Sequence, residues 1–87
     1  MRIFYSPEFK RKYKRLPVEI QRKAEEKEII FLKDSFDPRL KTHKLHGRLG
    51  DFWAFSVDER CRIIFKFQDN KTVRFYAVGD HSLYNKL

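Results

Sequence analysis

The pattern of apolar residues changes at Phe36-Asp37-Pro38, and this change divides the 87-residue chain into two kinds of structure. Before that point, apolar side chains recur at intervals of three and four residues, which is typical of helices that bury one face. After it, short stretches of β-branched and aromatic residues alternate with Gly, Asp and Asn, which is typical of strands joined by turns. The chain is therefore predicted to form an α+β fold, with helices packed on a small antiparallel sheet.

The first part of the chain predicts a strand and two helices. A short β-type run over 3–5 ends at Ser6-Pro7, where Ser can cap a helix and Pro suits its first turn. The spacing predicts one helix over 7–16 and a second over 17–34, and the two are expected to form an antiparallel hairpin. Their buried faces are expected to hold Phe9, Tyr13 and Leu16 in the first helix, and Ile20, Ala24 and Phe31 in the second.

The second part predicts a three-stranded meander, with strands near 52–57, 60–67 and 72–78. Two residues, 58–59, separate the first pair of strands and four residues, 68–71, separate the second pair, so both connections are expected to be tight hairpins. There is no linker or repeat, and one domain spans 1–87.

Alternation within 60–67 places the odd-numbered residues under the helices and the even-numbered residues on the opposite face. Arg62 therefore points away from the helices. A two-residue turn would place Phe55 across from Arg62, with Trp53 on the same face, whereas a bulge would bring Ser56 to Arg62. The sequence leaves both registers open.

The charge of the chain favours a polyanionic partner. Twenty Lys and Arg residues against twelve Asp and Glu give a net charge of +8 and a pI of about 9.8. Residues 1–50 hold fourteen of the basic and seven of the acidic side chains, so the excess lies mainly in the N-terminal half. A domain of this length has no room for a deep cofactor cleft, which places function on the surface or in a shallow groove.

The cysteine content and the length of the apolar runs indicate the cellular compartment. Cys61 is the one cysteine, so an intramolecular disulfide is excluded and a reducing cytoplasm is the expected location. The longest apolar run, Ile29 to Leu32, is too short to span a membrane, and the N-terminus looks like a strand rather than a signal peptide. No membrane partner is predicted.

Arg62 and His81 are the candidate catalytic residues that the pattern itself suggests. A mid-strand guanidinium suits a phosphate and the charge that grows on it during attack, although a surface arginine paired with an acid fits as well. His81 follows the last strand, where an imidazole can transfer protons near neutral pH, with Asp80 or a backbone carbonyl to fix its tautomer. A loop histidine without a role is equally compatible with the sequence.

His43 and His46 precede Gly47 in a segment expected to be a loop. Two imidazoles three residues apart suggest zinc, but the sequence has no second Cys or His pair with metal-ligand spacing, so no metal is predicted. An acid–base pair of one of them with His81 is the better functional interpretation. Tyr84 can stack on a base or bond a phosphate oxygen, or it can anchor the C-terminus in the core.

Other residues suggest contact with RNA. Trp53 offers a ring for base stacking, although aromatic residues in strands more often lie in the core. The basic run that contains Lys10, Arg11 and Lys14 fits either a solvated helix face or a surface that meets RNA phosphates. Nucleotide-binding and Ser-His-Asp signatures are absent from the sequence.

Together these features resemble the RelE/ParE superfamily of small bacterial toxins from type II toxin–antitoxin modules, across nearly the whole chain. Each feature is weak alone, and their order and spacing make the resemblance specific. The chain is most similar to the YafQ and YoeB types, which also finish shortly after a terminal His and aromatic residue. The matching segments are Ser6-Pro7-Glu8-Phe9, His43-x-Leu45-x-Gly47, Phe52-Trp53, Arg62-Ile63-Ile64-Phe65 and Val78-Gly79-x-His81-x-x-Tyr84.

The resemblance implies a ribosome-dependent endoribonuclease that cuts mRNA in the A site without a metal or cofactor and is silenced by a cognate antitoxin. In that chemistry the ribose 2′-hydroxyl attacks the adjacent phosphate. Arg62 matches the arginine that stabilises the developing charge, and His81 matches the general acid. His43 is the leading general-base candidate, with His46 second, and Tyr84 matches the C-terminal aromatic residue.

The chain departs from the family where RelE carries catalytic lysines and YoeB carries arginines, because residues 54–56 are Ala, Phe and Ser. Basic charge for RNA is then expected from Lys44, Arg48 or Arg60. The YoeB glutamate base has no clear counterpart, which favours a mechanism based on histidines. Two alternatives stay open: a ParE-like inhibitor that binds DNA gyrase, and an inactive RNA- or ribosome-binding protein.

Overall fold

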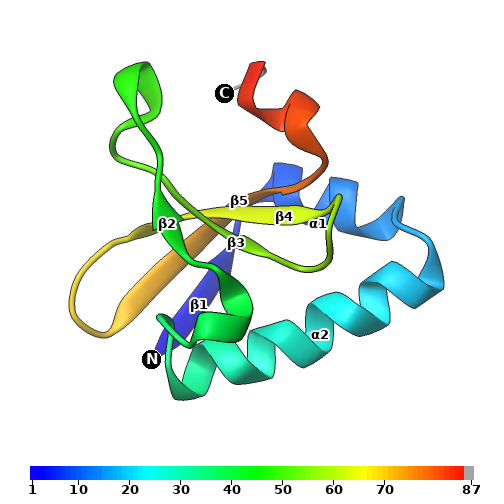
Figure 1. Ribbon diagram of the computed structural model, residues 1–87, viewed down its shortest axis with the longest axis horizontal. Coiled ribbons are helices and arrows are strands. Elements are labelled where there is room, and N and C mark those ends of the chain that lie inside the picture. Colours follow the sequence, from blue (N-terminus) through cyan, green and yellow to red (C-terminus); the bar gives the residue numbers. More distant parts are fainter. Residues whose placement is uncertain (86–87) are drawn as a thin grey trace.

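The computed structural model describes residues 1–85 and shows two helices packed on one face of a five-stranded sheet, in the strand order β1-β5-β4-β3-β2 (Figure 1). β1 pairs with β5 in parallel, and the other neighbours are antiparallel. The predicted α+β, RelE-like fold is confirmed. The elements are β1 (Arg2–Tyr5), α1 (Pro7–Lys14), α2 (Val18–Lys33), β2 (His43–Lys44), β3 (Trp53–Ser56), β4 (Arg62–Phe67) and β5 (Thr72–Gly79), with 3-10 turns η1 (Pro38–Leu40), η2 (Gly47–Leu49) and η3 (His81–Asn85).

The predicted meander is present, but the sheet has two further strands at its edges. β1 extends it beyond β5, with Arg2 opposite Thr72 and Tyr5 opposite Phe75. β2 extends it beyond β3, where a loop was expected, because His43 pairs with Ala54. A strand of two residues has no detectable alternation, so only its pairing reveals it.

The helix-side core is built around Phe31 of α2, which is fully buried. Its ring lies 4.9 Å from that of Phe55, 5.0 Å from that of Phe65 and 5.6 Å from that of Phe75. Each such ring contributes roughly 1.5–3 kcal/mol by leaving water. The predicted helix stripes are confirmed, since the following residues all belong to this core or pack against it: Phe9, Tyr13, Leu16, Ile20 and Ala24.

Ser6 joins α1 to the sheet. Its side-chain oxygen accepts a hydrogen bond from the Phe9 amide at 3.0 Å, as expected of an N-cap, and its hydroxyl donates to the Tyr76 carbonyl at 2.9 Å. Tyr76 is the extra residue of a bulge in β5, because Phe75 pairs with Phe65 and Ala77 pairs with Ile64. The bulge leaves the Tyr76 carbonyl available to Ser6.

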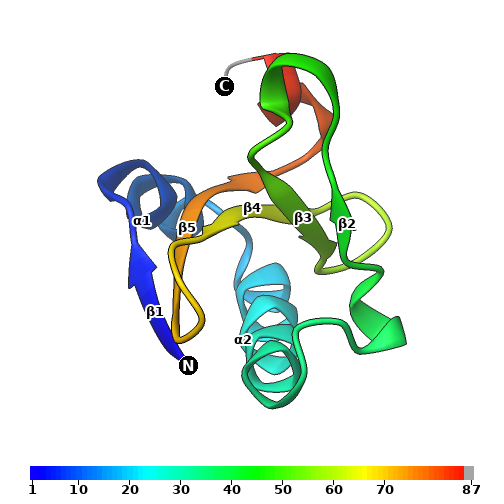
Figure 2. The ribbon, with the colours of Figure 1, turned by 90° about the vertical axis from the view of Figure 1, so that its left-hand side faces the viewer.

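A smaller apolar cluster covers part of the opposite face of the sheet. η2 and η3 lie close together there, on the side away from α2 (Figures 1 and 2). Arg48 ties the two turns together, because its Nη2 donates to the Tyr84 carbonyl at 3.0 Å. The buried members of this cluster are Leu45, Ala54, Ile64, Ala77 and Leu83.

The β3–β4 connection is longer than the predicted two-residue turn, which was wrong. It spans 57–61, and the Asp58 carboxylate organises it by accepting from the Arg60 and Cys61 amides at 2.8 and 2.7 Å. Val57, Arg60 and Cys61, which were expected to lie in the strands, therefore belong to the turn. The predicted four-residue β4–β5 connection, 68–71, is confirmed. Within residues 1–85, neither helix has the length and apolar character needed to cross a membrane.

Candidate functional site

Arg62 lies at the end of the sheet, in a row formed by Gly79 of β5, Arg62 of β4 and Ser56 of β3. Paired residues point to the same face, so Arg62 and Ser56 share the face away from the helices. The register with Ser56 opposite Arg62 is the bulged alternative. The alternative that placed Phe55 and Trp53 beside Arg62 is excluded, because the longer turn shifts the pairing by one residue.

The Arg62 guanidinium has an unused donor. Its Nη1 atom is buried and has no hydrogen-bond partner within residues 1–85. A buried donor without an acceptor costs about 1–3 kcal/mol, so an anion that reached this atom would be bound strongly. The residue as a whole is half-buried, so part of it reaches solvent although Nη1 itself does not.

A hollow of 370 Å³ borders Arg62, and most of the charged groups around it are cationic. Lys27 of α2 and Lys41, which follows η1, line it together with Ser56 and Arg62. Lys41 is brought there by the β2–β3 pairing, since it stands two residues before His43, the partner of Ala54. The sequence did not identify Lys27 or Lys41 as site residues. If β2 had been predicted, its pairing with β3 would have placed Lys41 near Arg62.

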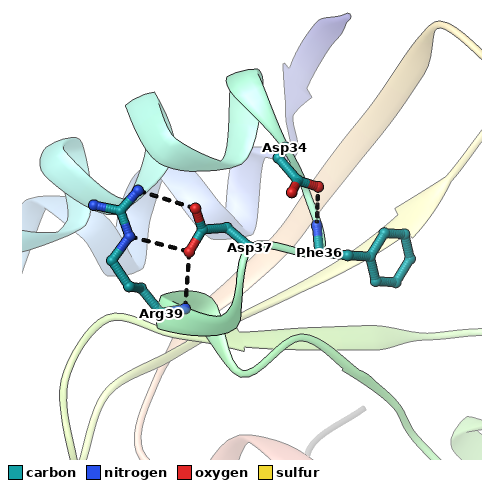
Figure 3. Close-up of polar contacts among 4 residues, drawn as sticks. All are labelled: Asp34, Phe36, Asp37 and Arg39. Atoms are coloured by element: carbon teal, nitrogen blue, oxygen red, sulfur yellow. Dashed lines mark hydrogen bonds and ion pairs between the residues drawn. The ribbon is translucent and has the colours of Figure 1, made fainter.

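Two carboxylates near this hollow, Asp37 and Asp58, are already engaged in local contacts. Arg39 is paired with Asp37 at 2.9 Å, and hydrogen bonds from its side chain and its amide lower the pKa of Asp37 to about 2 (Figure 3). Asp58 also lines the hollow. Partial burial opposes ionisation of Asp58, but the Cys61 and Arg60 amides outweigh it and lower the pKa of that carboxyl. The Asp58 carboxylate is therefore engaged by hydrogen bonds within its own turn.

His81 and Tyr84 lie together on η3, with their rings 5.6 Å apart and nearly perpendicular. η3 is fixed by Leu83, which is buried against the sheet, and by Asp80, whose Oδ1 accepts from the Ser82 amide at 2.9 Å and from the Ser82 hydroxyl at 2.6 Å. His81 is exposed and follows Gly79, the partner of Arg62, by two residues. The imidazole and the guanidinium therefore belong to the same end of the sheet.

His43 lies on the edge strand β2, on the same face as Arg62, because its partner Ala54 belongs to the cluster on that face. Its Nδ1 is 3.0 Å from the Lys41 carbonyl. A carbonyl only accepts, so Nδ1 carries the proton and Nε2 is left to accept one. Three inter-strand spacings, about 14 Å along the sheet, separate β2 from β5, and β4 with Arg62 lies between them. His46 is exposed just before η2.

Trp53 was expected to offer a ring to RNA, and the structure places it on the helix side instead. Its ring packs against those of Phe36 and Phe67, at 5.5 Å from each. It therefore faces away from Arg62. Lys44 pairs with Trp53 and shares that side of the sheet.

The remaining basic residues are divided between the two sides. Arg48 lies beside η3, and Arg60 is exposed in the β3–β4 turn. Lys10, Arg11 and Lys14 lie on α1, which covers the helix side of β5. These three cannot contact the same stretch of RNA as Arg62 unless the partner surrounds the molecule.

Metal-ligating side chains do not converge in the part of the chain that the structure describes: no group of three or more His, Cys, Asp or Glu residues is placed to hold an ion. Cys61, which the sequence singled out as the lone thiol, is buried under the helices. The polar groups that the structure gathers at this end of the sheet include the Arg62 guanidinium, the Lys27 and Lys41 ammonium groups and the Ser56 hydroxyl, with His81 and Tyr84 on η3.

These features define a fold class, an α+β fold of the RelE-like type. The chain is similar to YafQ from E. coli strain BL21(DE3), with a TM-score of 0.79 and 19% identity over 97% of this chain and 98% of that chain. A YoeB/ParE toxin from Agrobacterium tumefaciens has a TM-score of 0.78 at 13% identity, covering 93% and 99% of the two chains. A chain of the E. coli DinJ–YafQ toxin–antitoxin complex matches with a TM-score of 0.75 and 20% identity, over 93% of this chain and 92% of that chain. No family model and no curated protein matches the sequence.

Proposed function

We propose that this chain is the toxin of a type II toxin–antitoxin module and that it cleaves mRNA on the ribosome without a metal. The similarity of its fold to YafQ and YoeB toxins supports the first part. The second part, cleavage of mRNA, rests on Arg62. Its Nη1 atom is a buried donor without a partner within residues 1–85, and it lies beside a cationic hollow. A phosphate of the message is the anion that this donor would receive.

In the proposed reaction, a general base removes the proton from a ribose 2′-hydroxyl, and the oxygen attacks the adjacent phosphorus. Arg62 donates to the phosphate oxygens, on which negative charge increases. The bond from phosphorus to the 5′-oxygen breaks as a general acid gives that oxygen a proton. The products are a 2′,3′-cyclic phosphate and a 5′-hydroxyl, and the two imidazoles exchange protons with water to restore their starting forms.

His81 is the proposed acid and His43 the proposed base, with His46 as second candidate. The tautomer of His43 supports this, because its Nε2 is the nitrogen left to accept a proton. Tyr84 supports His81 by limiting the orientation of its ring. The Lys41 carbonyl orients the His43 ring through Nδ1, and His81 is exposed where a leaving 5′-oxygen could meet it, which supports this assignment of base and acid.

The proposed partners follow from the division of the basic residues. The message lies on the face of Arg62, within reach of Arg48 and Arg60, while Lys10, Arg11 and Lys14 meet ribosomal RNA or the antitoxin from the other side. A cognate antitoxin is proposed because YafQ occurs with DinJ in a solved complex. A ribosomal target also places the protein in the cytoplasm.

The proposal is tested by inducing the chain in bacteria and mapping transcript ends by primer extension. Wild-type protein is expected to arrest growth and to cut translated messages, whereas Arg62→Ala and His81→Ala relieve both effects and still fold. Arg22→Ala, on the exposed side of α2, is the matched control and should remain toxic. Intact transcripts together with a loss of DNA supercoiling would replace this proposal by the gyrase alternative, and binding to ribosomes without either effect would indicate an inactive binding protein.

A further inference from the structure

Part of the sheet face that carries Arg62 lies beyond η2 and η3, over β1, β5 and β4 (Figure 2). In these strands Ile3, Phe65, Val73 and Phe75 pack into the helix-side core, so the residues that alternate with them point outward. None of the outward residues is fully buried, apart from those that the smaller apolar cluster covers. We call the remaining set the cation–aromatic face, and it consists of Arg2, Phe4, Lys66, Thr72, Arg74 and Tyr76.

Strand pairing brings the members of this face together. Phe4 of β1 is opposite Arg74 of β5, and Arg74 is opposite Lys66 of β4, which makes one row across three strands. The bulge in β5 turns the Tyr76 ring to the same face, where it meets Phe52 edge-on at 5.2 Å. Phe4 is 47% exposed, so its ring is accessible to a ligand.

Each cation of this face lies over an aromatic ring. The Lys66 Nζ atom is 4.4 Å from the centre of the Phe52 ring, and Arg74 is 5.5 Å from that of Tyr76. Arg2 is 5.6 Å from the Phe4 ring. Such contacts are worth only about 0.5–1 kcal/mol at exposed sites, so a stronger anionic ligand can draw the cations away from the rings.

Carboxylates are absent from the strands that build this face. β1, β4 and β5 contain no Asp or Glu at all, and within residues 1–85 none of Arg2, Lys66 and Arg74 takes part in an ion pair. Elsewhere basic and acidic side chains are interspersed, as on α2. Three uncompensated cations interleaved with ring faces match a ligand that has both phosphates and planar bases.

A hollow of 260 Å³ at the edge of this face adds polar groups. Phe4 and Arg74 line it, together with Gln68 and Thr72. The Gln68 amide and the Thr72 hydroxyl can both donate and accept, so they suit the edge of a base whose ring stacks on Phe4. An acidic peptide would satisfy the cations but would leave the ring faces without a stacking partner.

We propose that the cation–aromatic face binds single-stranded RNA, as a second contact for the message that is cleaved at Arg62. This inference rests on the proposed function for the identity of the strand. Arg62 and Lys66 lie on the same strand and face, four residues or about 13 Å apart, so one strand of RNA can contact both. Bases stack on Phe4 and Tyr76, and phosphates draw Arg2, Arg74 and Lys66 from the rings.

Binding is measured by fluorescence anisotropy with the full chain and a labelled 2′-O-methyl oligoribonucleotide, which has no 2′-hydroxyl to react. Phe4→Ala is expected to weaken binding about 10-fold, because one base no longer stacks. Arg74→Glu should weaken it further and reduce the slope of log K against log salt concentration by about 0.7 for each phosphate that is no longer neutralised. Arg22→Glu, the same charge change on the exposed side of α2, should leave binding within about 2-fold of the wild type. Thermal melts confirm that each variant is folded.

Three results would overturn the inference: no binding by the wild type, equal weakening by Arg74→Glu and Arg22→Glu, or displacement of the RNA by polyglutamate at equal charge concentration. The last would make this face a protein-docking surface. Because the probe cannot be cleaved and no ribosome is present, the outcome is independent of catalysis. If translated mRNA stays intact but Phe4→Ala weakens binding, the proposed ribonuclease fails and the RNA-binding face stands.

Discussion

Arg62 pairs with Gly79 across β4 and β5, and the side chain of Leu83 packs directly over that glycine. This relationship joins the guanidinium to the turn that carries His81 and Tyr84. The position of η3 over the end of the sheet therefore depends on a residue without a Cβ. A direct structural link thus connects the two halves of the candidate site.

Replacement of Arg62 by Met should separate activity from stability. Nη1 has no acceptor within residues 1–85, so Arg62→Met is expected to keep the stability of the wild type or raise it by about 1 kcal/mol. Cleavage of translated mRNA should fall by roughly 10²–10³-fold, the effect of removing one donor to a developing oxyanion. Urea denaturation and primer extension on the same preparations measure both. A large loss of stability would mean that the guanidinium has a structural partner.

Gly79→Ala should displace η3. A Cβ at this position would lie 3.2 Å from Leu83 Cδ2 and 3.3 Å from Cγ, closer than side-chain carbons normally pack. We expect a loss of about 1–2 kcal/mol in stability and a reduced cleavage rate. Combined with Leu83→Ala the two changes should be strongly non-additive, because the second removes the clash. Additive free energies in this double-mutant cycle would show that Leu83 is not the cause.

Ser6→Ala should loosen the junction of α1 and β5. The substitution removes the N-cap bond to the Phe9 amide and the bond to the Tyr76 carbonyl, for an expected loss of about 1–2 kcal/mol. Ser35→Ala, in the connection after α2, is the control and should change stability by less than about 0.5 kcal/mol. Equal effects of the two substitutions in urea denaturation would contradict the role given to Ser6.

Asp58→Asn should remove a pH-dependent part of the stability. The folded pKa of Asp58 is lowered, so its contribution is present above the unfolded value of about 4 and decreases as pH falls through the folded pKa. The variant should therefore be less stable than the wild type at pH 7 by about 1 kcal/mol, because solvent screens this carboxylate, with the gap closing as the pH falls through the folded pKa. Glu59→Gln, the exposed neighbour, serves as control. A gap that is constant with pH would contradict this account.

Cys61 should be slow to react in the folded protein. Burial, and next the charge of Asp58, raise the pKa of its thiol to about 11, so little thiolate exists at a pH of about 8. Ellman's reagent is expected to label it much more slowly in buffer than in guanidinium chloride. Rapid labelling of the native protein would show that the β3–β4 turn opens readily and exposes the thiol.

The elements of this fold with strong local signals were predictable. Phe9 and Tyr13 stand at helical spacing, Ser6-Pro7 marks a helix start, and the alternation through Ile63 and Phe65 identifies the face under the helices; the structure confirms all three. Burial of apolar surface imposes these patterns on the sequence, so they can be read from it directly. The same alternation placed Arg62 away from the helices, on the face where Ser56 opposes it.

Only the tertiary structure decided what depends on pairing between distant segments. The hydrogen bonds that Asp58 accepts from the Arg60 and Cys61 amides stabilise the turn whose register puts Ser56 rather than Phe55 beside Arg62. β2 is defined only by its pairing with β3, which brings His43 and Lys41 to the site. The alignment of Phe4 with Arg74 likewise exists only because β1 joins β5. The Asp58 bonds are local contacts within a turn, whereas β1–β5 and β2–β3 pairing joins residues far apart in the chain, and hydrophobic periodicity encodes neither.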